Sequence, residues 1–116
     1  ETQSKLKAAG LPWERSKAFT GSALFSEFVQ APEDLSQLGL ELRVNDALRQ
    51  KGDVSLMLYP LAVILEELRQ FLTLEDGDII MTGTPAGVGP VQSGECFDGR
   101  VLAGEQVLAQ AVWQAH

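Results

Sequence analysis

The alternation of apolar and polar residues predicts a chain built mainly from short strands. Apolar and polar residues alternate strictly over residues 40–44, which is typical of a half-buried strand. Asn45 and Asp46 then predict a turn, and residues 47–51 are expected to return as the partner strand of a hairpin. Alternation over residues 105–113 predicts a further strand. The end of the chain is therefore expected to be β.

The clearest helical pattern lies over residues 60–72, and its apolar stripe comprises Leu61, Ile64, Leu65, Leu68, Phe71 and Leu72. Pro60 suits the first turn of this helix. We expect the stripe to cover a sheet rather than to bind a partner helix or a cofactor. A shorter, mostly polar helix is predicted over residues 1–10, where Gly10 would end it.

The remaining segments predict more extended structure. Residues 19–29 carry aromatic and β-forming side chains, which favours one or two short strands. Residues 31–36 are expected to form a loop or a single helical turn, and short extended pieces alternate with turns over residues 91–100. No internal repeat or linker divides the chain. The predicted fold class is β-rich α+β, in one domain.

The stretch over residues 76–90 combines a turn, a strand and a glycine-rich loop. Asp76 and Gly77 predict the turn, and the short apolar run 79–81 predicts a buried strand. Three glycines and two prolines follow within residues 83–90, and Thr84 offers a hydroxyl at the strand's exit. Such a loop suits a carboxylate or enolate oxygen. The alternative is a tight connection between two strands, and the glycine spacing matches no nucleotide-binding motif.

Composition narrows the classes of function. The chain has 116 residues, 45% of them hydrophobic, which fits one globular domain with a modest core. A net charge of −7 disfavours nucleic acid as a partner. Cys96 is the only cysteine, which excludes an internal disulfide and a cysteine-rich zinc site. No membrane-spanning or export segment is recognised, and we expect a cytoplasmic protein.

The residues alone offer few candidates for catalysis. His116 is the only histidine and lies at the last position, so Ser-His and Cys-His nucleophilic schemes lack a base. The carboxylates lie on the exposed helix face or around the turn, in no arrangement typical of a metal site. Lys17 precedes the first apolar run and could pair with an anion, although a lone lysine is normally solvated.

Three segments resemble, in order and spacing, the fumarylacetoacetate hydrolase family. They are residues 10–19 (GLPWERSKAF), residues 43–50 (RVN and LRQ) and residues 77–89 (GDIIMTGTPAGVG). The resemblance covers nearly the whole chain. It is greatest to the small acylpyruvases and to isomerases of the homoprotocatechuate pathway, a route of aromatic catabolism. The resemblance implies a β-roll of mixed sheets, a homodimer, and Mg²⁺ or Mn²⁺ that chelates the oxygens of a 2-oxo acid or β-diketo acid.

The resemblance also implies site residues. Lys17 matches the family's active-site lysine, Thr84 its loop threonine, and Gln3 the glutamine that closes an Arg-Asp-x-Gln motif. Lys17 and Thr84 are therefore the catalytic candidates, while Gln3, Gly83 and Thr84 are the substrate-binding candidates. We expect Lys17 and Thr84 to reach one ligand-sized cavity. Departures at Ala23, Leu24 and Val54, which replace family residues of the pocket wall, leave the substrate open.

The family's metal carboxylates and its His-Glu dyad precede the Arg-Asp-x-Gln motif and have no counterpart here. Residues 1–116 are thus expected to be the C-terminal portion of a single catalytic domain, with the N-terminal half of the same protein as partner and metal ligands outside this segment. The intact enzyme would catalyse C–C hydrolysis, decarboxylation or isomerisation of a small 2-oxo acid through a metal-bound enolate, whereas this segment alone would be inactive. The alternative is a non-catalytic β-rich binding or assembly module.

Overall fold

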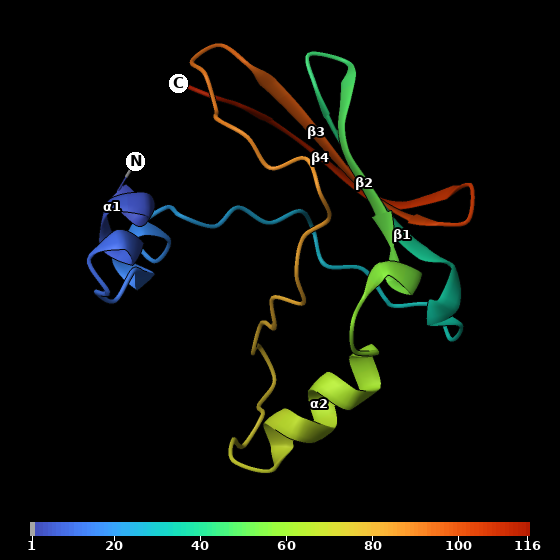
Figure 1. The fold of residues 1–116 in the computed structure, drawn as a ribbon. Coiled ribbons are helices and arrows are strands. Elements are labelled where there is room, and N and C mark those ends of the chain that lie inside the picture. The colour runs from blue at the N-terminus through green and yellow to red at the C-terminus, as the bar shows by residue number, and fades with distance from the viewer. Residues whose placement is uncertain (1) are drawn as a thin grey trace.

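A computed structural model describes residues 2–116 of the chain. Its four strands are β1 (Leu38–Val44), β2 (Ala47–Asp53), β3 (Cys96–Ala103) and β4 (Gln106–Gln114). They pair antiparallel throughout, in the order β2-β1-β3-β4 (Figure 1). The helices are α1 (Thr2–Ala8) and α2 (Leu61–Arg69), with single 3-10 turns η1 (Glu14–Ser16), η2 (Leu35–Gln37) and η3 (Val54–Leu56). The predicted β-rich α+β class is confirmed.

The hairpin of β1 and β2 forms where the sequence predicts it. Asn45 and Asp46 make a two-residue turn with φ of 48° and 66°, the left-handed conformation that such turns need at both positions. The Asn45 N–H donates to the carbonyl of Cys96, and its side-chain oxygen accepts from the Cys96 N–H, each at 2.9 Å. The turn is therefore joined to the start of β3.

The sheet has one apolar and one charged face. On the apolar face Leu40 lies opposite Val101, and Val44 lies opposite Phe97. The charged face carries Glu41 opposite Arg100 and Arg43 opposite Asp98, so charges of opposite sign alternate across β1 and β3. Arg43 pairs with Glu41 at 2.6 Å, and Arg100 with Asp98 at 2.5 Å. The charged side chains of one face are paired with each other, so this face can be exposed to solvent. The apolar face is available for packing.

Both predicted helices are present. α1 ends before Gly10, whose φ is 65°; Glu1 lies outside the described residues. α2 begins directly after Pro60. Its contact with the sheet is smaller than expected, because only Leu61 and Ile64 of the stripe line a cavity shared with the strands. Within residues 2–116 no helix is long and apolar enough to cross a bilayer.

Two predicted strands are absent from the described chain. Residues 19–29 and 79–81 are extended, but neither segment pairs with another (Figure 1). Residues 23–29 make no backbone-to-backbone hydrogen bond to the part of the chain that the structure describes, and the stacked rings of Phe25 and Phe28 are 6.0 Å apart. A β-strand is formed by backbone hydrogen bonds to an adjacent strand. Extended residues that lack such a partner therefore remain coil.

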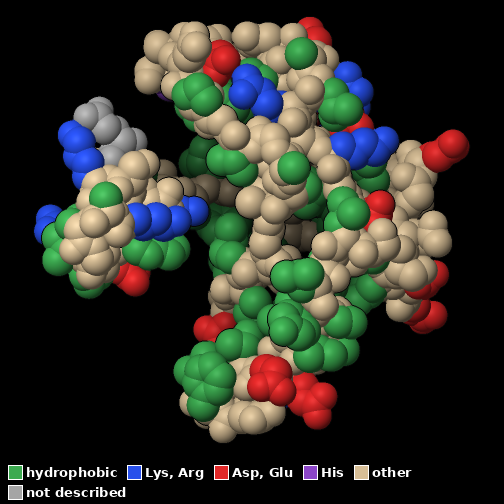
Figure 2. Space-filling view, in the orientation of Figure 1, with side chains coloured by type: hydrophobic (Ala, Val, Ile, Leu, Met, Phe, Trp, Pro, Cys, Tyr) green, Lys and Arg blue, Asp and Glu red, His purple; other side chains and the backbone are tan. Residues whose placement is uncertain are grey.

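The chain is far more open than a compact protein of its mass. Its accessible surface is 9404 Å², against about 6,200 Å² for a folded monomer of this size. Val44 is the only described apolar residue that is buried, while Leu58 and Phe28 are 93% and 76% exposed. Hydrophobic side chains accordingly reach the visible surface in several patches, including some over α2 (Figure 2). The apolar face of the sheet lacks an enclosing layer within residues 2–116.

Candidate functional site

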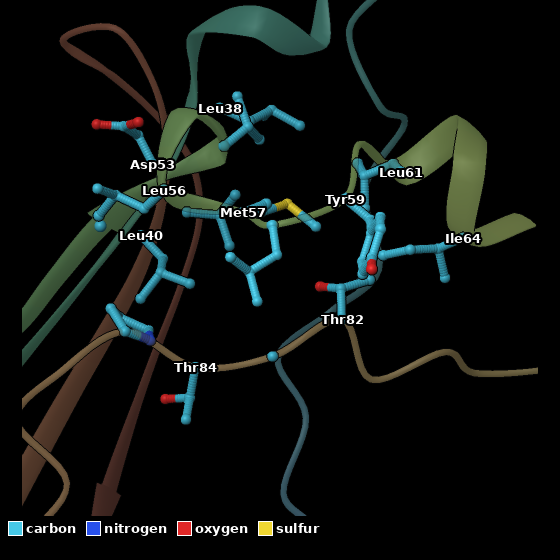
Figure 3. Close-up of a pocket in the computed structure, with 17 residues that line it drawn as sticks. Leu38, Leu40, Asp53, Leu56, Met57, Tyr59, Leu61, Ile64, Thr82 and Thr84 are labelled. Atoms are coloured by element: carbon cyan, nitrogen blue, oxygen red, sulfur yellow. The ribbon is translucent and has the colours of Figure 1, made fainter.

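A cavity with a volume of about 550 Å³ lies over the apolar face of the sheet. Leu40, Gly52 and Val101 form its floor, α2 and the segment before it form one wall, and residues 82–85 form the other (Figure 3). Segments far apart in sequence therefore meet here. Gly83 and Thr84, two of the predicted site residues, are among those that line it.

The glycine-rich loop is held against β2. Gln50 of β2 donates from Nε2 to Thr84 Oγ1 at 3.1 Å and to the carbonyl of Pro85 at 2.8 Å. A Cβ at Gly52 would lie 2.9 Å from the Cβ of Pro85, so a glycine is needed where the proline crosses the strand. These contacts fix Thr84 relative to the sheet.

A β-bulge in β2 lies beside this contact. Leu42 pairs with Gln50 and Arg43 pairs with Leu48, which leaves Arg49 as the extra residue. Bulges bend a strand and redirect the side chains next to them, and they are common beside active sites. The bulge explains how a residue of an edge strand can face a loop that passes over the sheet.

The two threonines of the loop point in different directions. Gly83, between them, has φ of 123° and turns the chain. The hydroxyl of Thr82 is directed toward the apolar side chains of the cavity, whereas the side chain of Thr84 points away from them at the rim (Figure 3). Sequence reasoning missed Thr82, although it stands two residues before Thr84 in the same TGTP run.

The cavity is apolar and lacks a cationic side chain among its described lining residues. Asp53 is its one charged residue, and its Oδ1 accepts from the Ser55 hydroxyl at 2.5 Å and from the Ser55 N–H at 2.9 Å. These hydrogen bonds, the side-chain one first, lower the pKa of Asp53 below its usual value. Asp53 is therefore ionised at neutral pH and is not a proton donor. Within residues 2–116 the cavity offers no charge that would hold a carboxylic acid.

The structure does not bring Lys17 or Gln3 to this cavity. Lys17 follows η1 and is exposed, with Nζ 5.9 Å from the centroid of the Trp13 ring. Gln3 is half-buried on α1, which stands apart from the sheet (Figure 1). The expected meeting of Lys17 and Thr84 therefore does not occur in this chain by itself. The roles assigned to Lys17, Gln3, Gly83 and Thr84 stay predictions.

The residues present do not fit a metal. Among residues 2–116 no group of three or more histidine, cysteine, aspartate or glutamate side chains could hold an ion. Mg²⁺ and Mn²⁺ take near-octahedral oxygen sets that usually include carboxylates. The divalent ion that the family resemblance implies therefore has no set of ligands within this part of the chain.

The comparisons with known proteins resolve the family. A family model described as "Fumarylacetoacetate (FAA) hydrolase C-terminal" matches residues 1–111. The chain belongs to the fumarylacetoacetate hydrolase family. It is similar to the oxaloacetate tautomerase YcgM of Escherichia coli (strain K12), with 41% identity over an alignment of 109 positions, which covers 88% of this chain and 50% of the relative. The chain thus spans about half the length of the curated relatives it matches.

Solved structures of this family share the fold. A putative isomerase of Escherichia coli has a TM-score of 0.84 at 34% identity, over 99% of this chain and 54% of that protein. A maleylpyruvate hydrolase from Sphingobium sp. SYK-6, in complex with manganese(II) and pyruvate, has a TM-score of 0.65 at 34% identity, over 73% and 31% of the two chains. The open shape described above is therefore similar to that of half of a larger folded protein.

Proposed function

We propose that the protein containing this chain interconverts the keto and enol forms of oxaloacetate or a closely similar 2-oxo acid. The observation that supports this most directly is the 41% identity with an oxaloacetate tautomerase over most of the chain. C–C hydrolysis and decarboxylation remain the neighbouring reactions, since both also pass through an enolate. Relatives of this family that act as a hydrolase and as a muconate isomerase support the common chemistry.

In tautomerisation a proton leaves the carbon beside the oxo group, and a proton is added to the oxo oxygen. After the first proton has left and before the second is added, the oxo oxygen carries the negative charge of an enolate. A fixed hydroxyl donor stabilises such a charge more than it stabilises the neutral ketone, which lowers the barrier. We propose Thr84 as that donor, Lys17 as the cation that pairs with a substrate carboxylate, and Gln3 and Gly83 as residues that border the substrate.

The same proposal requires a second polypeptide segment. Three observations support a partner that corresponds to the N-terminal half of the same protein. The apolar face of the sheet is uncovered, and residues 19–29 and 79–81 are extended but unpaired. The chain is also similar to half of a larger protein. We propose that this half completes the mixed-sheet roll, brings Lys17 toward Thr84, and supplies ligands for Mg²⁺ or Mn²⁺. Bound there, the metal would supply positive charge for the substrate's oxygens. The assembled protein would be a homodimer.

The exposed thiol of Cys96 bears on the compartment of the protein, and the net charge of the chain bears on its partners. Cys96 is an exposed free thiol, which fits a reducing compartment, and we keep a cytoplasmic location as a prediction. The net charge of −7 argues against nucleic acid. We therefore propose a small-molecule substrate.

The decisive experiment is a tautomerase assay on the full-length protein that carries this chain. The enol form of oxaloacetate absorbs in the ultraviolet, so its metal-dependent conversion to the ketone is followed directly. Acceleration in proportion to enzyme concentration supports the proposal, with acylpyruvates tested in parallel for hydrolysis. The lack of a metal site within residues 2–116 favours the second candidate, a non-catalytic assembly module. Full-length protein that neither binds Mn²⁺ nor accelerates any of these reactions would favour that second function instead.

A further inference from the structure

The side-chain amide of Gln50 has one possible orientation. Its terminal atom lies 2.8 Å from the carbonyl oxygen of Pro85. A carbonyl oxygen only accepts hydrogen bonds, and the amide oxygen of glutamine also only accepts. The atom that faces Pro85 must therefore be the amide nitrogen, because two acceptors at this distance would repel each other.

The orientation of the amide fixes the direction of the Thr84 hydroxyl. The same Gln50 nitrogen lies 3.1 Å from Thr84 Oγ1. An amide nitrogen donates two hydrogen bonds and accepts none, so Oγ1 is the acceptor here and its own hydrogen must point elsewhere. Within residues 2–116 no acceptor takes that hydrogen. Thr84 is thus left with a free O–H that is kept from pointing toward Gln50.

The support behind Gln50 is rigid. Gln50 is half-buried, follows the Arg49 bulge and pairs in register with Leu42 of β1. A side chain held by two hydrogen bonds on a paired strand loses little further freedom when a ligand arrives, and donors fixed in advance are the effective ones in catalysis. We propose that Gln50 is a positioning residue, which keeps the Thr84 hydroxyl as a donor to the substrate's developing enolate oxygen. This inference rests on the proposed function of Thr84.

The test uses two substitutions in the full-length protein. Gln50→Met keeps the length of the side chain and deletes both donors, so the hydroxyl can rotate. We expect kcat to fall about tenfold, the worth of roughly one ordinary hydrogen bond, with KM changed less than about threefold. Gln50→Glu keeps the shape and turns a donor into an acceptor that captures the Thr84 hydrogen. We expect a fall of about 100-fold, similar to the loss of an oxyanion donor.

The Gln50→Glu variant also has a pH signature. A protonated carboxyl can donate to Thr84 Oγ1 as the amide does, and the ordinary pKa of a glutamate is about 4.3. The ratio of the variant's kcat to that of the unsubstituted protein should therefore rise as the pH falls from 8 toward 5. A merely structural role for Gln50 would leave this ratio flat, which would overturn the inference.

The control is Gln110→Met. Gln110 is also a strand glutamine whose Nε2 donates to one side chain, Asp98 at 2.8 Å, but it lies on the charged face. Its loss should change the melting temperature and leave kcat unchanged. Equal kcat values for Gln50→Met and Gln110→Met would overturn the inference.

The double variant Gln50→Met/Thr84→Val separates the inference from the function on which it rests. Without a hydroxyl at position 84 there is nothing to orient, so Gln50→Met should lower kcat less than about twofold further when Thr84→Val is already present. Strict multiplication of the two effects would show that Gln50 acts apart from Thr84. If Thr84→Val lowers kcat and Gln50→Met does not, the inference alone fails. A normal kcat for Thr84→Val defeats the proposed role of Thr84 as well.

Discussion

The α-carbon of Gly87 lies against the backbone carbonyl of Arg49, the extra residue of the β2 bulge, so closely that any side chain at position 87 would collide with that oxygen. Gly87 also has φ of 105°, a conformation that other residues rarely adopt. We therefore expect Gly87→Ala to lower the free energy of unfolding of the full-length protein by more than the 1–3 kcal/mol or so of backbone strain alone. Urea denaturation followed by circular dichroism measures the loss.

The matched control for this prediction is Gly94→Ala. Gly94 has φ of 86°, but a Cβ there would meet no atom within 4 Å. The substitution therefore adds backbone strain without a collision. Equal losses for the two variants would mean that the loop does not rest on the bulge as described.

The charged face of the sheet makes a pH-dependent contribution to stability. The hydrogen bond from Arg100, followed by the one from Gln110, lowers the pKa of Asp98 below its usual value. A carboxyl whose pKa is lower in the folded state stabilises the fold above its unfolded pKa, and loses that effect as the pH falls through the folded pKa. Asp98→Asn should therefore cost stability at pH 5–7 and cost progressively less below about pH 4.

Equilibrium unfolding at a series of pH values measures this difference, with Glu105→Gln as the control. Glu105 lies in the exposed turn between β3 and β4 and has no ion pair to the described residues. An Asp98→Asn penalty that stays constant from pH 7 to pH 2.5 would contradict the assigned hydrogen bonds.

Metal binding should require more than this segment. Since no group of three ligands converges within residues 2–116, we expect the separate chain to bind Mg²⁺ or Mn²⁺ no better than an ordinary acidic surface does. The full-length protein is expected to bind one ion per chain. Isothermal titration calorimetry on both makes the comparison, and stoichiometric micromolar binding to the separate chain would refute the assignment of the ligands to another segment.

The exposed apolar side chains predict the behaviour of the separate chain in solution. Side chains such as Leu58 and Met81, which are 93% and 78% exposed, should bind a hydrophobic dye such as anilinonaphthalene sulfonate. Co-expression with the N-terminal half should yield a complex whose dye fluorescence is several-fold lower. Unchanged fluorescence in a purified complex would place that half elsewhere.

The elements that sequence predicts correctly are those with local signals. The hairpin at Asn45 and Asp46 and the helix after Pro60 depend on turn chemistry and periodicity within a few residues. Residues 19–29 have the composition of strands, yet pairing is a non-local property and no described segment pairs with them. Their prediction as strands is therefore wrong for this chain alone.

The same distinction applies to the site. The loop of Gly83 and Thr84 is evident from its glycine spacing and from the family resemblance. Gln50 could not be assigned a role, because its contact with Thr84 depends on a bulge and on a loop 34 residues away meeting in space. The only available signal was its place at the end of the LRQ segment that carries the resemblance.

The proposed donor role of Thr84 gives the most direct test of the site. Thr84→Val keeps the β-branched shape and removes the hydroxyl that now accepts from Gln50. If this hydroxyl donates to an oxygen whose charge grows in the transition state, the barrier should rise by about 2–4 kcal/mol, mainly through kcat and with a smaller change in KM.

Stability separates this prediction from a purely structural role of the residue. Thr84 is exposed and lies at the cavity rim, so its hydroxyl contributes little to the apolar core, and we expect the melting temperature of Thr84→Val to move by only a few degrees. Thr73→Val, at an exposed loop position that lines neither described cavity, controls for the substitution itself. A turn residue without a chemical role would give the reverse pattern. The melting temperature would then fall because the contact with β2 is lost, and the protein that remains folded would turn over oxaloacetate at the normal rate.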